Sequence, residues 1–326
     1  MRQVGFQHQA LVYEGSGDFL AGVVPFVEAA LEAEEPVLIA VRATQRGWLE
    51  ERFGAADGVR YAAIEEVGRN PALIIPLWRD FVEENAGRPV SGVGEPAWPG
   101  RSPAALEECR RHAALLNLGF ADAPDFSLLC PYDAAGLPSR VLEGIAVFHR
   151  RLDWGERARE SAEFGAALDC FAGSLPPPAV APTTLEFGLT ELAEVRHRVT
   201  AAGEQAGLNP RGVADLVTAT SELAANSVMH GGGSGTLRLW REGGRILAEV
   251  EDRGRIEDPL VGRIRPDITQ EGGRGLWLAN QLCELVQIRS GAGGTAVRLH
   301  MPVGAETPAA GSGRRQMGPR AAFSSA

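Results

Sequence analysis

The run Gly173–Pro182 (GSLPPPAVAP) constrains the fold of this chain more than any other feature of its sequence. Proline lacks a backbone N–H and fixes its own φ angle, so neither a helix nor a central strand continues through such a run. The chain has 326 residues, a length typical of two domains. We therefore predict an N-terminal domain (1–152), a helical and proline-rich linker (153–182), a C-terminal domain (183–302) and a disordered tail (303–326).

Short apolar runs alternate with amphipathic segments before this break. Apolar strands separated by helices are typical of a mainly parallel α/β sheet, which is buried on both faces. We expect strands at 8–13, 36–41, 59–64, 90–94 and 126–131, and helices at 18–34, 45–52, 71–85 and 102–118. Asp18 is the expected N-cap of the first helix. Another amphipathic helix, Trp154–Phe171, is expected to connect the domains.

The order of elements changes after the break. The pattern predicts a strand at 184–188, helices at 190–206 and 210–230, strands at 235–241 and 245–252, a helix at 276–285 and strands at 286–290 and 295–301. Asn209 and Pro210 provide an N-cap and a favourable first residue for the helix at 210–230. Helices beside a mostly antiparallel sheet indicate an α+β sandwich.

Charge and composition restrict the partners. The 32 Lys and Arg against 42 Asp and Glu give a net charge of −10, which disfavours nucleic-acid binding because that depends on neutralising phosphates. No apolar run reaches the roughly 20 residues that span a bilayer, and no signal-peptide pattern is present. We therefore expect a soluble, cytoplasmic protein without membrane contact. The cysteines lie far apart in the sequence and are expected to be reduced and buried: Cys109, Cys130, Cys170 and Cys283.

Three polar residues are spaced by four along the helix expected at 210–230. Glu222, Asn226 and His230 therefore share one helical face. Magnesium takes oxygen ligands and usually only one or two from protein, so the amide of Asn226 is a candidate Mg²⁺ ligand. Glu222 is a candidate general base near a terminal phosphate. The alternative is an ordinary polar face of a helix.

Two further motifs fit a nucleotide. Asp252 ends a strand, and its carboxylate only accepts hydrogen bonds, as the exocyclic amine of adenine requires. Gly254 permits a sharp turn beneath the base, although Asp-x-Gly turns are common at strand ends. The glycines of 272–275 precede a helix and leave N–H groups free for phosphate oxygens. The arginine-containing segment 255–271 has the character of a lid, and Thr295 offers a hydroxyl near Asp252 or is simply a β-branched strand residue.

The order and spacing of these motifs resemble the GHKL superfamily, whose ATP-binding domain has the Bergerat fold. Glu222–Gly231 resembles its N box, Asp252–Gly254 its adenine-contacting box, Gly273–Leu276 its glycine box and Thr295 its closing threonine. The stretch 183–302 is most similar to anti-sigma-factor serine kinases. The resemblance implies binding of ATP and Mg²⁺, with Glu222 as the catalytic residue. The implied ATP-binding residues are Asn226, His230, Asp252, Gly254, Gly273, Arg274, Gly275, Leu276 and Thr295.

The same resemblance implies one of two activities. The domain either phosphorylates a Ser or Thr of a STAS-type anti-sigma antagonist or sequesters a sigma factor without catalysis. The resemblance also implies that the chain forms homodimers. A sensor histidine kinase is the third alternative, and it needs a phosphoacceptor histidine. His197 lies within the ATP domain itself, and His149 lacks the acidic residue that follows such an acceptor. Both observations disfavour this alternative.

The N-terminal half has no Gly-x-x-x-x-Gly-Lys-[Ser/Thr] run, so an intact P-loop is excluded. Its segments His8–Tyr13, Gly94–Ser102 and Leu129–Asp133 resemble the MEDS sensory domain, which looks like a degenerate RecA/KaiC-type fold. The resemblance implies sensing of a small organic ligand and control of the ATP domain. Ligands of open α/β sheets bind beyond the carboxyl ends of the strands. Packing within proline-shaped turns is the alternative role of the candidate residues, which are His8, Glu95, Trp98, Cys130, Tyr132 and Asp133.

Overall fold

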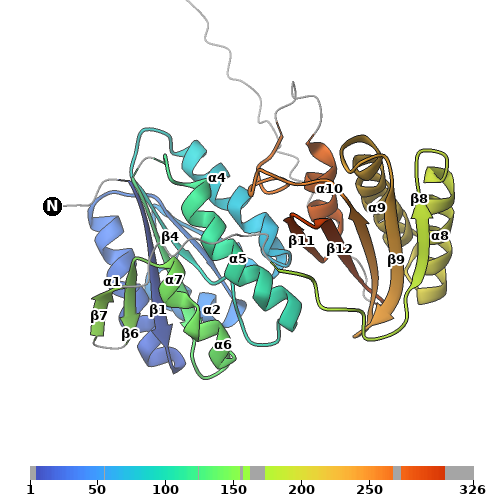
Figure 1. The fold of residues 1–326 in the computed structure, drawn as a ribbon. Helices are drawn as coiled ribbons and strands as arrows, with labels where there is room; N and C mark the ends of the chain where they lie inside the picture. Colours follow the sequence, from blue (N-terminus) through green and yellow to red (C-terminus); the bar gives the residue numbers. More distant parts are fainter. Residues whose placement is uncertain are drawn as a thin grey trace, which may run out of the picture.

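Two domains, each built on its own β-sheet, lie side by side (Figure 1). The computed structural model describes residues 5–54, 56–123, 125–154, 157–161, 173–266 and 273–304. Within these ranges no helix is both long and apolar enough to cross a bilayer. The expected tail falls outside the described residues from position 305 onward, as do 155–156 and 162–171 of the expected connecting helix, 267–271 of the expected lid, and Gly272.

The N-terminal sheet has the strand order β3-β2-β4-β5-β1-β6-β7. Its strands are β1 (Phe6–Tyr13), β2 (Val37–Val41), β3 (Val59–Ala63), β4 (Val90–Gly94), β5 (Phe126–Asp133), β6 (Arg151–Trp154) and β7 (Arg157–Glu160). Neighbouring strands are parallel except for the antiparallel pair of β6 and β7. The predicted, mainly parallel α/β fold is therefore confirmed.

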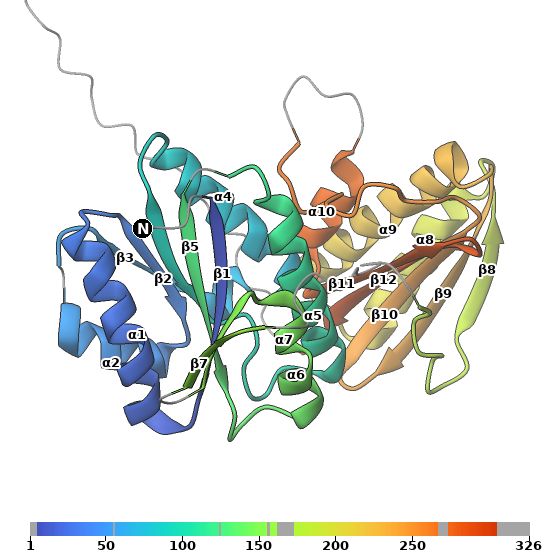
Figure 2. The same ribbon diagram turned by 60° about the vertical axis from the view of Figure 1, so that its left-hand side comes forward.

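Helices cover both faces of this sheet. On one face, α1 (Gly15–Glu32) and α2 (Ala43–Phe53) bury an apolar cluster with β1 and β2. On the other face lie α4 (Ile74–Glu84) and α5 (Pro103–Gly119). Figure 2 shows α5 beside the strands of the C-terminal domain. The short elements are α3 (Ile64–Val67), η1 (Pro71–Leu73), α6 (Ser139–Glu143) and α7 (Ile145–Phe148).

Two local predictions differ from the structure. Helix α1 begins at Gly15 rather than at Asp18, and the Asp18 carboxylate accepts a hydrogen bond from the backbone N–H of Glu14 at 3.2 Å. Asp18 therefore stabilises the first turn from within the helix. The helix expected from Trp154 is wrong where the chain is described, because β6 and β7 form a hairpin at the edge of the sheet.

The C-terminal sheet is antiparallel and has the order β11-β12-β10-β9-β8. Its strands are β8 (Thr183–Phe187), β9 (Gly235–Glu242), β10 (Arg245–Asp252), β11 (Leu285–Gly291) and β12 (Gly294–Pro302). Three helices pack on one face: α8 (Leu192–Ala206), α9 (Pro210–His230) and α10 (Arg274–Leu282). The predicted α+β sandwich is confirmed.

The two faces of this sheet have different chemistry. Side chains alternate along β12, so Val297 and Leu299 enter the core beneath the helices while Arg298 and His300 lie on the opposite face. That polar face is also buried. Arg298 donates a hydrogen bond to the backbone oxygen of Pro176 at 2.8 Å, and Arg289 of β11 contacts α5. The proline-rich segment and the N-terminal domain therefore cover it.

Candidate functional site

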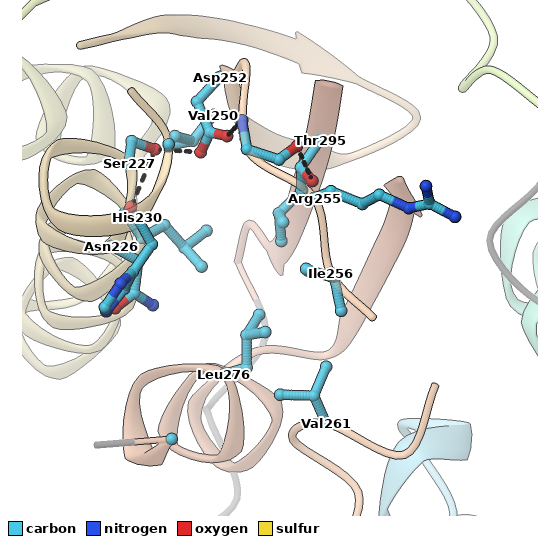
Figure 3. A pocket seen from close by; sticks show the side chains of 15 residues that line it. Asn226, Ser227, His230, Val250, Asp252, Arg255, Ile256, Val261, Leu276 and Thr295 are labelled. Atoms are coloured by element: carbon cyan, nitrogen blue, oxygen red, sulfur yellow. Dashed lines mark hydrogen bonds between the residues drawn. The ribbon is translucent and has the colours of Figure 1, made fainter. Parts of the chain in front are cut away.

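A cavity of about 200 Å³ lies between α9, α10 and the adjoining ends of β10 and β12 (Figure 3). Its walls are mostly aliphatic, which suits a flat heteroaromatic ring better than a hydrated ion. Polar groups come from α9 and from the end of β10. The apolar lining consists of Leu223, Val250, Ile256, Val261, Leu276 and Val297.

The Asp252 carboxylate is fixed within this cavity by two hydrogen bonds. Ser227 on α9 donates its hydroxyl to Oδ2 at 2.6 Å, and the backbone N–H of Gly254 donates to Oδ1 at 2.7 Å. An ionised carboxylate has about four acceptor positions. Asp252 can therefore accept a further hydrogen bond from a group inside the cavity that it lines.

Two glycines permit the close packing around Asp252. A Cβ atom on Gly231 would lie 2.4 Å from Cγ of Asp252, and one on Gly254 would lie 2.8 Å from the backbone oxygen of His230. Both distances are shorter than real Cβ contacts. The end of α9 and the turn after β10 therefore approach each other as only glycine allows.

Thr295 lines the cavity, but its hydroxyl serves the protein backbone. It donates to the backbone oxygen of Gly254 at 2.9 Å and shares a hydrogen bond of 2.7 Å with the hydroxyl of Ser290. Ser290 in turn accepts from the N–H of Ile256. Thr295 and Ser290 thus hold the segment that follows Asp252 as it crosses the cavity mouth.

The polar face of α9 meets the N-terminal end of α10. Asn226 and His230 line the cavity, whereas Glu222 does not. A Cβ atom on Gly275 would lie 3.0 Å from Oε2 of Glu222 and 3.1 Å from Nδ2 of Asn226. Glu222, Asn226 and Gly275 thus lie close together.

The first residues of α10 have the expected loop-to-helix geometry. Gly273 lines the cavity with a φ angle of +75°, Arg274 is exposed at the first helical position, and Leu276 is buried against the cavity. The N-terminal N–H groups of a helix attract anions. Together with the oxygens of Asn226 and Glu222, this end of the cavity fits a phosphate chain with Mg²⁺.

The six candidates in the N-terminal domain fall into separate places. Glu95, which follows β4, and Asp133, the last residue of β5, both pair with Arg42, at 3.1 and 3.5 Å. The Tyr13 hydroxyl also donates to Glu95 at 3.1 Å. Burial raises the pKa of Glu95, although Arg42 opposes the shift. Trp98 lies apart from this group, beneath the guanidinium of Arg101.

His8, Cys130 and Tyr132 gather in the core on the face covered by α5. His149, which follows α7, completes this group. Burial lowers the pKa of His8 well below its usual value, and His149 adds to the effect. Burial also lowers the pKa of His149 to about 4 and raises the pKa of the Cys130 thiol. The group is therefore uncharged at neutral pH.

Sequence reasoning missed the residues that join the domains. The Asn70 side chain donates to the backbone oxygen and to Oδ1 of Asn280, at 3.1 and 2.9 Å. Arg289 donates to Glu108 at 2.9 Å. These partners are 210 and 181 residues apart, so no local pattern pairs them. The sequence offers one signal for such residues, a polar residue within an otherwise apolar helical stripe, and it applies to Asn280 and Ser227.

Comparison with protein families finds matches in both domains. Residues 7–150 match the family described as the MEthanogen/methylotroph, DcmR Sensory domain (MEDS), and residues 185–301 match the histidine kinase-like ATPase domain. A search of curated proteins finds no match. One similar solved structure contains the RsbU and RsbW domains of Rv1364c from Mycobacterium tuberculosis. It is 25% identical over 37% of this chain, with a TM-score of 0.28, and the match spans 32% of its length.

Proposed function

The chain is a MEDS domain followed by a histidine kinase-like ATPase domain of the GHKL type, and on this premise we propose that it is an ATP-dependent anti-sigma regulator controlled by its N-terminal domain. Its proposed activity is transfer of the γ-phosphate of ATP to a Ser or Thr of a STAS-type antagonist. Sequestration of a sigma factor with ATP as a structural ligand is the alternative outcome of the tests below.

The geometry around Asp252 is the observation that carries the proposal. Its carboxylate is held by Ser227 and Gly254 at one end of an aliphatic cavity. An adenine ring needs apolar contacts on both faces and an acceptor for its exocyclic amine. The cavity offers both, with Leu276 and Val261 opposite the carboxylate (Figure 3). Base selectivity follows from the acceptor, because a guanine carbonyl would meet the carboxylate with no proton to share.

The phosphates are placed by the other end of the cavity. With the base against Asp252, the phosphate chain extends toward Gly273 and the first turn of α10. Asn226 is the proposed Mg²⁺ ligand, and the ion supplies charge neutralisation at the β- and γ-phosphates. Glu222 beside Gly275 is the proposed general base. It accepts the proton of the acceptor hydroxyl as that oxygen attacks the γ-phosphorus and ADP leaves.

Control by the N-terminal domain is supported by the contacts of α10. Leu276 lines the nucleotide cavity, and Asn280 one turn later accepts the hydrogen bonds of Asn70. Asn280 also donates to the backbone oxygen of Gly262 at 2.9 Å. One short helix therefore contacts the cavity, the N-terminal domain and the segment after Asp252.

The segment 255–263 makes a second connection. Ile256 and Val261 line the cavity, while Leu260 packs against the apolar core of the N-terminal domain. Arg263 lies 3.6 Å from Glu108 of α5. A movement of α5 therefore changes the position of one cavity wall, which is a physical route from sensory ligand to nucleotide affinity.

Calorimetry and a phosphotransfer assay on two variants test the proposal. Asn226→Ala is expected to abolish binding of ATP-Mg²⁺. Glu222→Ala is expected to keep binding and to lose transfer to an antagonist protein, at a cost of about 10² to 10⁴ in rate. Wild-type affinity in Asn226→Ala would refute the site assignment. Wild-type protein that binds ATP and a sigma factor but phosphorylates no antagonist would establish the sequestering alternative.

A histidine autokinase would reveal itself by acid-labile phosphate on the chain itself. The location of His149 argues against this outcome, because its side chain is fully buried in the N-terminal domain. His197 lies on α8, and its side chain is 80% exposed. His197→Gln therefore serves as the control for any label retained by the chain.

A further inference from the structure

A compact group of potential ligand atoms lies inside the N-terminal domain, and none of its residues lines the nucleotide cavity. One ring nitrogen each of His8 and His149 and the sulfur of Cys130 lie within 4.8 Å of one another. Among the described residues, they form the one group of three such side chains close enough to share an ion. They come from β1, from β5 and from the residue after α7, and each is at most 3% exposed.

The hydrogen bonds around His8 fix its tautomer. The Asn117 amide donates its Nδ2 proton to the backbone oxygen of Phe148 at 2.8 Å, so Oδ1 of the amide faces His8. Nδ1 of His8 therefore donates to Oδ1 of Asn117, at 3.0 Å. The other nitrogen, Nε2, carries the lone pair and lies 3.4 Å from Sγ of Cys130.

His149 is held in the same way. Its Nδ1 donates to the backbone oxygen of Ile145 at 2.8 Å. Nε2 then carries the lone pair and lies 3.4 Å from the hydroxyl of Tyr132. In known metal sites, a ligating histidine donates its other ring N–H to a carbonyl or carboxylate, which orients the ring and raises its basicity. Both histidines have that arrangement before any ion is considered.

We propose that His8, Cys130 and His149 bind a divalent transition-metal ion of the Zn²⁺ or Co²⁺ type. The ligands would be Nε2 of each histidine and the thiolate sulfur of Cys130. Two imidazoles and one thiolate are donors that such ions prefer over the hard oxygen ligands of Mg²⁺ and Ca²⁺. Binding releases the Cys130 thiol proton to solvent, so the ion replaces that proton as the partner of the sulfur.

The present distances are close to those of a tetrahedral site. Metal–sulfur and metal–nitrogen bonds of about 2.3 and 2.0 Å at a tetrahedral angle place sulfur and nitrogen about 3.5 Å apart. The separation of Cys130 Sγ and His8 Nε2 is 3.4 Å. Three protein ligands leave one position open, and the Tyr132 hydroxyl lies 3.4 Å from Nε2 of His149. The other two separations are at most 4.8 Å, so side-chain shifts that shorten them by up to about 1.5 Å complete the site.

Cobalt binding by the full-length chain tests the proposal. Because the site is buried, the chain is refolded from denaturant with Co²⁺ or with Zn²⁺ after removal of metals by chelator. We expect one equivalent of Co²⁺ per chain, with the charge-transfer absorption of a thiolate–cobalt bond. We also expect Zn²⁺ to raise the midpoint of thermal unfolding of the wild type, because an ion that binds only the folded chain stabilises it.

Two cysteine variants locate the ligand. Cys130→Ser is expected to lose the charge-transfer band and at least tenfold in Co²⁺ affinity. Cys109→Ser is the matched control, because Cys109 is equally buried in the same apolar cluster and its thiol donates to the backbone oxygen of Pro96. It is expected to keep the band.

Wild-type stoichiometry keeps the test decisive if a variant fails to fold. Less than about 0.2 equivalents of Co²⁺ in refolded wild type would overturn the proposal and leave a hydrogen-bonded cluster in which the Cys130 thiol donates to His8. A charge-transfer band that persists in Cys130→Ser and disappears in Cys109→Ser would also overturn it. Loss of ATP binding alone would bear on the nucleotide cavity and not on this site.

Discussion

Glu108→Gln is the change that most directly tests how the two domains are joined. Glu108 on α5 contacts Arg289 at 2.9 Å and Arg263 at 3.6 Å, and all three side chains are 6% exposed or less. Glutamine keeps the shape and one acceptor oxygen but removes the negative charge. Arg263 and Arg289 then lose a negative charge that they share, and so does Arg111, which lies 3.8 Å from Glu108 on the same helix.

The free-energy cost of Glu108→Gln follows from the burial of these side chains. Removing one partner of a buried ion pair costs up to about 3–5 kcal/mol, because the remaining charge loses compensation. Separation of the two domains limits this cost, because Arg263 and Arg289 are then hydrated again. The cost therefore appears as weaker docking, and a shift of 3–5 kcal/mol changes the ratio of docked to separated molecules by roughly 10² to 10³ or more.

Amide hydrogen exchange measures how far the weaker docking exposes each segment of the interface. Amides of 255–263 and of α10 are expected to exchange faster in Glu108→Gln, whereas amides of α9 keep wild-type rates. ATP affinity is expected to change as well, because Val261 and Leu276 belong to both the moving segments and the cavity. Isothermal calorimetry gives that change directly.

The neighbouring residue provides the control. Glu107 also pairs with arginines of α5, but its side chain is 38% exposed, so Glu107→Gln should cost less than about 1 kcal/mol. Identical exchange rates for 255–263 in wild type and Glu108→Gln, together with identical ATP affinity, would refute the reasoning. The ion pair would then be a static contact without influence on the nucleotide cavity.

Three further results are expected. Asp252→Asn loses a charged acceptor worth about 1.5–3 kcal/mol and should weaken ATP binding about 10- to 100-fold by calorimetry; unchanged affinity would place adenine elsewhere. Gly231→Ala puts a Cβ atom 2.4 Å from Cγ of Asp252 and should weaken ATP binding at least tenfold in the same assay, whereas Gly291→Ala, with open space around it, should not. Burial, with the charge of Arg298 adding to it, lowers the pKa of His300 to about 3, so protonation favours the unfolded chain below about pH 6.5. Between pH 7 and pH 5, the free energy of unfolding measured with urea should therefore fall by about 2 kcal/mol more in wild type than in His300→Gln. Parallel pH profiles of the two proteins would contradict this.

Most of the fold was predictable because its elements follow local rules. Helix α9 spans the predicted residues 210–230, since Pro210 begins it and the side chain of Asn209 caps it by accepting from the N–H of Gly212. The edge hairpin of β6 and β7 was not predictable. The residues of β7 are Arg157–Glu160 (RARE), so this strand lacks an apolar alternation, and its pairing depends on the neighbouring strand.

The candidate nucleotide site was predictable for a similar reason. Asn226, Asp252 and Gly275 lie in three short motifs whose spacing is visible in the chain, and the structure gathers these residues around or beside one cavity. The role of Ser227 was not visible, because its partner Asp252 lies 25 residues away. Rules based on close cysteine spacing likewise find no metal site at Cys130, since His8 is 122 residues distant.

Helix α10 has a thermodynamic consequence for both domains. Its nine residues contact the nucleotide cavity through Leu276 and the N-terminal domain through Asn280. Free-energy coupling between two binding sites is reciprocal, so any factor by which a sensory ligand changes ATP affinity is also the factor by which ATP changes affinity for that ligand. If the proposed sensory control holds, the ATP concentration would therefore shift the ligand concentration at which the N-terminal domain responds.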